Sequence, residues 1–311
     1  MIPCLSFNLL AVLGPTASGK TRLAVELAEE FGGEIISADS RQVFRRMDIG
    51  TGKDLAEYGK TPYHLIDILE PGDEFSVFAF QRLFLKVFAE ISSRERLPIL
   101  CGGTGMYLDA ALRGYRMVEI PENKAWRAEL EGASNEELVK RLVKLRPEQH
   151  NNTDLLDRQR IIRALEIARF TPDIDSNNDS FPDIKPLVIG IRRERSDLRR
   201  RITERLRRRL QEGMIDEARR LSDEGVTWER LDYYGLEYRF AGAFLRGELS
   251  ENDLFQKLNS AIHNFAKRQE TWFRRMERCR VPINWVDGNG DMAAEAKQLV
   301  LNNARQGSVL S

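Results

Sequence analysis

One short segment, GPTASGKT at residues 14–21, constrains the fold of this chain more than any other. It matches the phosphate-loop pattern G-x-x-x-x-G-K-[ST], with the apolar run NLLAVL at 8–13 before it and a helical pattern from Lys20 to Phe31 after it. In such a loop, backbone N–H groups, a lysine and a helix N-terminus all favour an anion. We therefore predict a di- or triphosphate site built from Gly14, Thr16, Ala17, Ser18, Gly19, Lys20 and Thr21, with the Thr21 hydroxyl as a Mg²⁺ ligand.

Strand-like and helical segments alternate along the chain, which predicts an α/β fold: a P-loop NTPase-like core with a parallel sheet and a helical insertion domain. Apolar runs of strand length lie at 8–13, 34–37, 64–69, 97–101, 186–191 and 283–286. Helical patterns lie at 20–31, 76–95, 105–112, in the Arg-rich segment after 191, near 214–224 and from about 251 to 278.

The insertion is predicted where the alternation stops. Residues 121–169 have helical patterns only, and TPDIDSNNDSFPD at 171–183 is typical of a polar loop. We predict that 1–116 is the first part of the core and 117–183 the helical insertion. The second part of the core, 184–311, then carries the Arg-rich and C-terminal helices.

A phosphate loop does not by itself specify a reaction. A kinase or NTPase also needs an Asp at the end of an apolar strand to hold Mg²⁺. The strand at 97–101 ends in Cys101-Gly102-Gly103, and Asp67 lies inside its strand. Asp39 directly follows the second strand, at the sheet edge where doubly wound folds bind ligands. The alternative for Asp39 is a purely local role in a helix cap or Asx-turn.

The net charge is zero, from 48 basic and 48 acidic residues, and this balance argues against a nucleic-acid partner. The distribution of charge argues the other way. Residues 192–209 hold ten arginines and three acids, and Lys267 to Arg280 hold six basic residues and two acids. A solvated helix face is the ordinary explanation of a charge run. Arginine without lysine, however, favours contacts with phosphate oxygens and bases.

The cellular compartment is predicted from the cysteine spacing and from the lack of an apolar run that could span a membrane or act as a signal peptide. Cys4, Cys101 and Cys279 are widely spaced and form no Cys-x-x-Cys pair, so we predict neither a disulfide framework nor a zinc site. No apolar run reaches the roughly 18 residues of a membrane span, and the N-terminal stretch lacks the basic region of a signal peptide. We expect a cytoplasmic monomer without a membrane partner.

Six stretches together resemble the bacterial tRNA dimethylallyltransferases, also called tRNA isopentenyltransferases. They are GPTASGKT at 14–21, ADSRQVFRRMDIGTGK at 38–53, HLIDILEP at 64–71, PILCGGTGMYLDAAL at 98–112, DRQRIIRALEI at 157–167 and NFAKRQETWFR at 264–274. They follow the family's order over about 260 residues. Plant adenylate isopentenyltransferases share much of the N-terminal set, whereas the last two stretches resemble the tRNA-modifying branch.

The resemblance implies transfer of the dimethylallyl group of dimethylallyl diphosphate to N6 of adenosine 37 of tRNA, next to the anticodon. It implies that Asp39 is the catalytic base and that Lys20, Thr21, Thr104 and Arg219 complete the catalytic set. Arg219 would contact the diphosphate, with Arg220 as the second choice. Mg²⁺ on Thr21 would help to stabilise the leaving group.

The resemblance also implies two groups of tRNA contacts. Asp39, Ser40, Arg41, Gln42 and Thr104 match the part that holds the target nucleotide, and Gln159, Arg160, Arg163, Lys267, Arg268 and Gln269 match contacts with the anticodon stem-loop. The residue pattern alone leaves alternatives open. The 157–167 stretch is also an amphipathic surface helix, and Trp272 and Phe273 are more typical of a core than of base-stacking platforms.

Two features depart from the family's pattern. The family has an Arg three residues before a Gly-Tyr-Arg/Lys motif, whereas this chain has DYYGLEY at 232–238, so a basic RNA contact is lost there. The insertion at 117–183 is also short.

Three rival functions are an adenylate prenyltransferase, a P-loop metabolite kinase and an RNA-binding module with a structural anion site. The lack of a carboxylate-terminated strand disfavours the kinase. The basic segments disfavour a free-nucleotide substrate, and a complete phosphate loop beside Asp39 disfavours a non-catalytic module.

Overall fold

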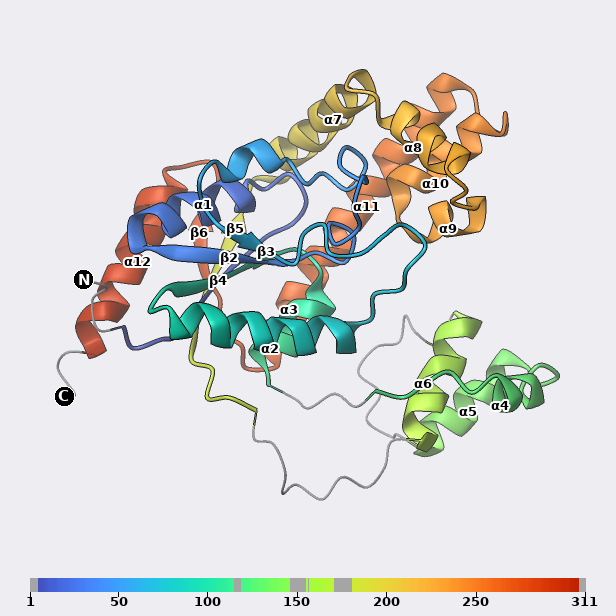
Figure 1. Ribbon diagram of the computed structural model, residues 1–311, viewed down its shortest axis with the longest axis horizontal. Helices are drawn as coiled ribbons and strands as arrows, with labels where there is room; N and C mark the ends of the chain where they lie inside the picture. The colour runs from blue at the N-terminus through green and yellow to red at the C-terminus, as the bar shows by residue number, and fades with distance from the viewer. Residues whose placement is uncertain (1–4, 115–118, 146–154, 156, 171–180, 308–311) are drawn as a thin grey trace. The chain divides into compact units, whose positions relative to one another are not determined.

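Six parallel strands form one sheet (Figure 1). The structure is a computed structural model that describes residues 5–114, 119–145, 155, 157–170 and 181–307. The strand order is β3-β2-β4-β1-β5-β6, which confirms the predicted α/β fold with a parallel sheet. The strands are β1 Leu9–Leu13, β2 Gly33–Ala38, β3 Tyr63–His64, β4 Leu97–Gly102, β5 Pro186–Arg192 and β6 Asn284–Asp287.

The chain divides into two compact units, Met1–Tyr115 with Pro182–Ser311, and Arg116–Phe181. The first unit contains the sheet. Its helices are α1 Lys20–Phe31, α2 Val77–Ser93, α3 Gly105–Leu112, α7 Arg195–Gln211, α8 Met214–Asp223, α9 Trp228–Tyr233, α10 Leu236–Leu245, α11 Glu251–Arg278 and α12 Met292–Gly307, together with the 3₁₀ helix η1 Leu55–Tyr58.

Both faces of the sheet are covered by helices. Successive strand residues point to opposite faces, and residues of β1 accordingly divide between two hydrophobic clusters, with Leu9 and Ala11 in one and Leu10 and Val12 in the other. Helices α1 and α12 cover the Leu10 face, and α2 and α3 cover the opposite face. The uninterrupted apolar sequence of β1 is thus explained by burial on both sides.

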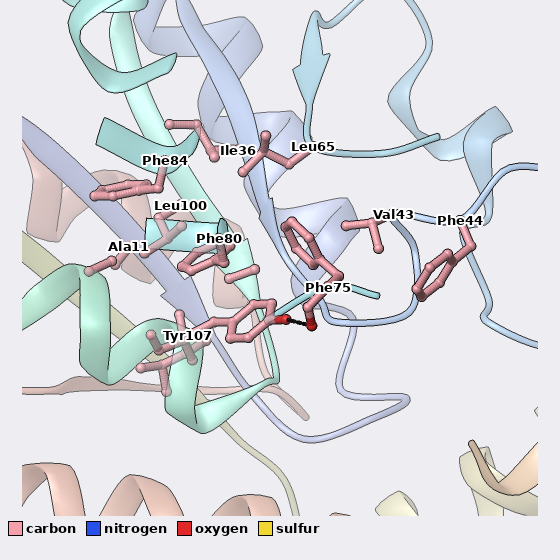
Figure 2. Packing of buried hydrophobic residues seen from close by; sticks show 14 of the residues in the cluster. Ala11, Ile36, Val43, Phe44, Leu65, Phe75, Phe80, Phe84, Leu100 and Tyr107 are labelled. Atoms are coloured by element: carbon pink, nitrogen blue, oxygen red, sulfur yellow. Dashed lines mark hydrogen bonds between the residues drawn. The ribbon is translucent and has the colours of Figure 1, made fainter. Parts of the chain in front are cut away.

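Aromatic side chains fill the space between the sheet and α2 and α3. Figure 2 shows Phe80 and Phe84 near Tyr107, with the rings of Phe80 and Tyr107 stacked at a centroid distance of 4.2 Å. The Tyr107 hydroxyl donates a hydrogen bond to the carbonyl oxygen of Phe75 at 3.3 Å. This packing holds the start of α3 near the carboxyl end of β4.

Helices α7, α8 and α11 share a further hydrophobic cluster. Leu198, Ile202 and Leu206 of α7 pack with Met214 of α8 and with Leu258 of α11. Their spacing gives α7 one apolar stripe, which leaves its arginines for the remaining faces.

The structure corrects the predicted strand at 64–69. Strand β3 ends at His64, because Leu65 and Asp67 adopt positive φ values of 62° and 54° that a strand does not accommodate. The carboxylate of Asp67 instead accepts a hydrogen bond from the buried ammonium of Lys53. Helices α9, α10 and α12 have no counterpart among the predicted segments.

The second unit has its own small core. Its helices are α4 Lys124–Glu129, α5 Asn135–Leu145 and α6 Arg158–Phe170, and Trp126, Leu138 and Ile161 are buried among them. The loop predicted at 171–183 lies largely outside the described residues. Among the helices that the structure describes, none is both long and apolar enough to span a membrane.

Candidate active site

Three loops meet at one edge of the sheet because β1, β2 and β4 are parallel neighbours. Leu13 is in register with Gly102, and Gly102 is in register with Ala38. The phosphate loop follows β1, Asp39 follows β2, and Thr104 follows β4. This edge is where doubly wound sheets bind their ligands.

The phosphate loop has the backbone shape of an anion site. Ala17 and Gly19 adopt positive φ values of 61° and 94°, and α1 begins immediately after Gly19. The first N–H groups of α1 therefore lack partners within the helix and are available to a ligand. Thr21 lies in the same first turn.

Lys20 supplies the positive charge of the loop. Burial lowers the pKa of its ammonium, the guanidinium groups of Arg205 and Arg209 lower it further, and the negative charge of Asp39 opposes the shift. An ammonium surrounded in this way is stabilised by an arriving anion, because the anion offsets both the burial and the neighbouring cations.

The side chain of Asp39 makes an Asx-turn, which was the alternative interpretation of this residue in the sequence analysis. Its Oδ1 accepts hydrogen bonds from the backbone N–H of Arg41 at 2.8 Å and of Gln42 at 3.4 Å. Within the described residues, Oδ2 accepts no hydrogen bond, so one carboxylate oxygen is available to a substrate. The turn and a catalytic role are compatible, because each uses a different oxygen.

Thr104 links the ends of β2 and β4. Its Oγ1 accepts a hydrogen bond from the backbone N–H of Ser40 at 3.2 Å, and its own N–H donates to the carbonyl oxygen of Ala38 at 3.2 Å. The two bonds place the Asp39 segment directly beside the start of α3.

Gln269 of α11 joins the phosphate loop to the end of β4. Its Oε1 accepts from the N–H of Thr16 at 2.8 Å, and its Nε2 donates to the carbonyl oxygen of Gly103 at 2.9 Å. The side chain is buried and engaged at both ends, so its observed contacts are structural. The tRNA contact implied for it stays a prediction.

We expect Gln269→Leu to lower the free energy of unfolding by about 2–4 kcal/mol. The leucine leaves the Thr16 N–H and the Gly103 carbonyl without partners, and each unsatisfied buried group costs about 1–3 kcal/mol. Chemical denaturation measures the effect. Gln298→Leu, at an exposed position of α12, is the control and should change stability by about 0.5 kcal/mol or less. Equal effects of the two substitutions would contradict the bridging role.

The model of the family described as IPP transferase matches residues 42–276. The chain belongs to the IPP transferase family. It is 72% identical over 298 residues to tRNA dimethylallyltransferase 2 of Pelobacter propionicus, covering 96% of this chain and 95% of the relative. It is 58% identical over 301 residues to tRNA dimethylallyltransferase 1 of Geotalea uraniireducens, covering 96% and 99% of the two chains.

Solved structures of related proteins share the fold. A tRNA isopentenylpyrophosphate transferase from Bacillus halodurans superposes with a TM-score of 0.73 at 33% identity, covering 98% of this chain and 99% of that chain. A eukaryotic dimethylallyltransferase, described as acting on tRNA, has a TM-score of 0.78 at 23% identity, covering 97% and 80%. The second likeness shows the IPP transferase fold alone.

In this member of the IPP transferase family, the Ser40–Gln42 segment is held from two sides. Gln42 Oε1 accepts from Ser37 Oγ at 3.1 Å, and Gln42 Nε2 donates to the carbonyl oxygen of Gly52 at 3.1 Å. The guanidinium of Arg41 lies over the ring of Tyr233, 4.8 Å from its centroid. Tyr233 belongs to the unusual DYYGLEY segment and is 47% exposed, so this segment places an aromatic ring, and no cation, beside Arg41.

Arginines of α7, together with Arg193 just before it, contact the phosphate loop, which the sequence did not predict. Arg193 Nε donates to the carbonyl oxygen of Ser18 at 2.8 Å, and Arg201 Nε donates to that of Ala17 at 2.9 Å. Arg205 Nη1 donates to Thr16 Oγ1 at 3.4 Å. Arg201, Arg205 and Arg209 are spaced four residues apart, and that single-face spacing was the available signal.

Glu217 fixes the loop that follows the Asp39 segment. This buried carboxylate accepts hydrogen bonds from the backbone N–H groups of Asp48, Ile49 and Gly50, each at 2.9 Å. The hydroxyl of Tyr238 donates to it at 2.7 Å. No sequence pattern signals this role, because the backbone groups that Glu217 binds lie 167–169 positions away along the chain.

Arg219 and Arg220 are exposed on α8. Arg219 Nη1 pairs with Asp216 at 3.1 Å, and the described interactions of neither arginine include the phosphate loop. The diphosphate contact implied for Arg219 therefore stays a prediction.

The remaining residues implied to contact tRNA lie on two helices. Lys267 and Arg268 are exposed on α11, and Gln159 and Arg160 are exposed on α6 of the second unit. Arg163 is instead engaged, since its guanidinium donates to Glu166 at 2.6 Å and to the carbonyl oxygen of Ile120 at 2.8 Å.

The expectation of a core role holds for Phe273, which is fully buried. Trp272 packs against Gly105, where a Cβ atom would lie 2.3 Å from the indole ring.

Proposed function

We propose that this chain transfers the dimethylallyl group of dimethylallyl diphosphate to N6 of adenosine 37 of tRNA. The observation that carries the proposal is the meeting of Lys20 and Asp39 at one sheet edge, with a phosphate loop on one side and a carboxylate oxygen available on the other. The relatives named tRNA dimethylallyltransferase support this assignment.

The site residues account for the balance of bonds and protons. The N6 lone pair forms the new C–N bond while the bond between the allylic carbon and the diphosphate oxygen breaks, and that electron pair leaves with the diphosphate. Lys20 and the N–H groups of the loop stabilise the negative charge that develops there. Asp39 accepts the proton from N6. Because an exocyclic amine is a poor nucleophile, alignment of N6 with the allylic carbon contributes strongly to the rate.

Mg²⁺ fits this site through Thr21. The described residues contain no group of three or more His, Cys, Asp or Glu side chains that could hold a metal. Mg²⁺ does not require one, because it ordinarily combines one or two protein oxygens with substrate phosphates and water. When bound, it supplies charge neutralisation at the leaving diphosphate.

The geometry disfavours phosphoryl transfer. Strand β4, which would carry the Mg²⁺-binding Asp of an ordinary kinase, ends at Gly102, and Thr104 follows it. Asp67, the other carboxylate considered from the sequence, is engaged by Lys53. The exposed basic residues of α6 and α11 favour a polynucleotide acceptor over a free nucleotide.

The decisive experiment offers the protein several acceptors. Unmodified tRNA with adenosine at positions 36 and 37 is incubated with dimethylallyl diphosphate and Mg²⁺, then digested and analysed by mass spectrometry. We expect N6-isopentenyladenosine from this tRNA and none from a tRNA with guanosine at position 37. Prenylation of AMP or ADP with no prenylated tRNA would instead establish an adenylate prenyltransferase.

We expect Arg160→Ala to weaken tRNA binding and to reduce the dependence of log K on log salt concentration by about 1, the amount expected for one lost phosphate contact. The guanidinium is 61% exposed on α6, where a backbone phosphate can reach it. Binding is measured at several salt concentrations. Lys297→Ala, which removes the same charge from α12, is the control. An unchanged salt slope in Arg160→Ala would place that side chain off the RNA.

A further inference from the structure

Arg209 carries a buried guanidinium with unused hydrogen-bonding capacity. The residue is 6% exposed, and its Nε and Nη2 atoms have no hydrogen-bond partner within the described residues. The nearest carboxylate is that of Glu237, 3.7 Å from Nη1, which is too long for a hydrogen bond. Burying an incompletely paired cation costs free energy, and an anionic ligand of Arg209 would offset that cost.

The guanidinium of Arg209 lies beside Gly52, in the loop that follows the Asp39 segment, and its charge helps to lower the pKa of Lys20. A Cβ atom on Gly52 would lie 1.5 Å from Arg209 Nη2, so the guanidinium occupies the space beside that glycine. One turn earlier on α7, Arg205 donates from Nη2 to the carbonyl oxygen of Gly52 at 3.3 Å and from Nη1 to Thr16 Oγ1 at 3.4 Å. Arg205 therefore contacts both the phosphate loop and Gly52, and Arg209 packs against Gly52 beside it.

Lys20, Arg205 and Arg209 lie close enough to disfavour one another's positive charge. Burial and the neighbouring charge of Arg205 together lower the pKa of Arg209 to about 10. The same two arginines contribute to the lowered pKa of Lys20. Asp54 pairs with Arg205, Glu237 lies near Arg209, and Asp39 and Glu57 interact electrostatically with Lys20. Within the described residues, none of these carboxylates hydrogen-bonds Nε or Nη2 of Arg209.

The position of the cation also differs from the family pattern described above. That pattern has Arg or Lys at the third position of its Gly-Tyr-Arg/Lys motif, where this chain has Glu237. Glu237 of α10 instead brings an acid near Arg209 of α7.

We propose that Arg209 is a ligand of the diphosphate, binding its phosphoryl oxygens through Nε and Nη2 beside Arg205. The inference rests on the proposed function for the identity of the donor. Free diphosphate is small enough to approach a guanidinium that is only 6% exposed, whereas a backbone phosphate of folded RNA requires an exposed partner. Arg209 thereby stabilises the leaving group in addition to the loop and Lys20.

Calorimetric titration with inorganic diphosphate and Mg²⁺ tests this assignment without requiring prenyl transfer. We expect Arg209→Met to weaken diphosphate binding roughly 10- to 100-fold, as loss of charge-assisted hydrogen bonds does. Arg209→Lys should recover part of the affinity. The control is Arg208→Met on the same helix, where the side chain is 59% exposed and pairs with Glu212; its affinity should stay within about twofold of the parent. An Arg209→Met affinity equal to the parent would overturn the proposal.

A purely structural role is tested by the double variant Arg209→Met/Glu237→Met. If Arg209 only neutralises Glu237, the double variant regains parental diphosphate affinity, and the proposal is wrong. If Arg209 is a ligand, the affinity stays low. Should Arg209→Met fail to fold, Glu237→Met decides alone: removing the competing carboxylate should tighten diphosphate binding, and unchanged affinity would count against the proposal.

Two further outcomes separate this inference from the proposed function. Loss of anticodon stem-loop binding in Arg209→Met with unchanged diphosphate binding would assign the guanidinium to RNA and overturn the proposal. If the parent protein binds diphosphate through Arg209 but prenylates no tRNA, the proposed function fails while the ligand assignment stands.

Discussion

Asp39→Ala is expected to lower the turnover of tRNA prenylation by roughly 10²- to 10⁴-fold, the range that general bases contribute. The alanine removes the acceptor of the N6 proton, while the exposed basic residues of α6 and α11 that we assign to RNA are unchanged. Binding of tRNA should therefore persist. Single-turnover kinetics with saturating dimethylallyl diphosphate, together with a tRNA-binding assay, measure the two quantities separately.

Asp39→Asn is the sharper companion variant. Its amide oxygen can still accept the N–H groups of Arg41 and Gln42, so the turn after β2 is retained while the base is lost. We expect Asn and Ala to be equally impaired in turnover. Near-normal turnover of Asp39→Asn would remove Asp39 from the base role and leave it the turn alone.

Lys20→Met is expected to lower turnover by roughly 10²- to 10³-fold, the loss typical of removing one preorganised group that stabilises developing charge. It should also weaken binding of inorganic diphosphate, because the ammonium interacts with both the bound donor and the leaving group. Arg22→Met, on the exposed face of the same helix, is the control and should leave both quantities unchanged. Equal effects of the two variants would show that only the general charge of α1 matters.

The pH dependence of diphosphate binding gives a second measurement on Lys20. Burial lowers the pKa of its ammonium, so the charge is lost at a lower pH than in an exposed lysine. Affinity for diphosphate should therefore fall as the pH rises through that lowered pKa, and this fall should be absent in Lys20→Met. A parental profile identical to that of Lys20→Met would contradict the assignment.

The sequence predicts best those parts of the molecule that are specified locally. The phosphate loop and β1 follow from adjacent residues, and Asp39 follows from its place after β2. Strand β3 was predicted too long because the buried pairing of Lys53 with Asp67 overrides the apolar pattern of HLIDIL. A pairing between residues 14 positions apart has no signature in a period of two or of 3.6.

Roles that depend on distant contacts were missed or assigned differently. Gln269 was implied to contact tRNA, yet its observed partners are Thr16 and Gly103, more than 160 positions away. The arginines of α7 were recognised as a phosphate-binding type, but only the folded chain shows that Arg201 and Arg205 reach the phosphate loop. The sequence therefore predicted the kind of group that these arginines bind, but it did not predict which part of the chain they contact.

The position of β1 in the middle of the sheet has a consequence for how the protein is made. Its neighbours are β4 and β5, and the pairing of Leu10 with Leu187 joins segments separated by the whole second unit. During synthesis, one edge of β1 remains unpaired until β5 emerges from the ribosome. The helices of the second unit can pack into their own hydrophobic core before then. Arg201, Arg205 and Gln269, which contact the phosphate loop, emerge later still. A nascent chain thus carries the loop sequence long before it can hold a diphosphate, and binding competence arrives only near the end of translation.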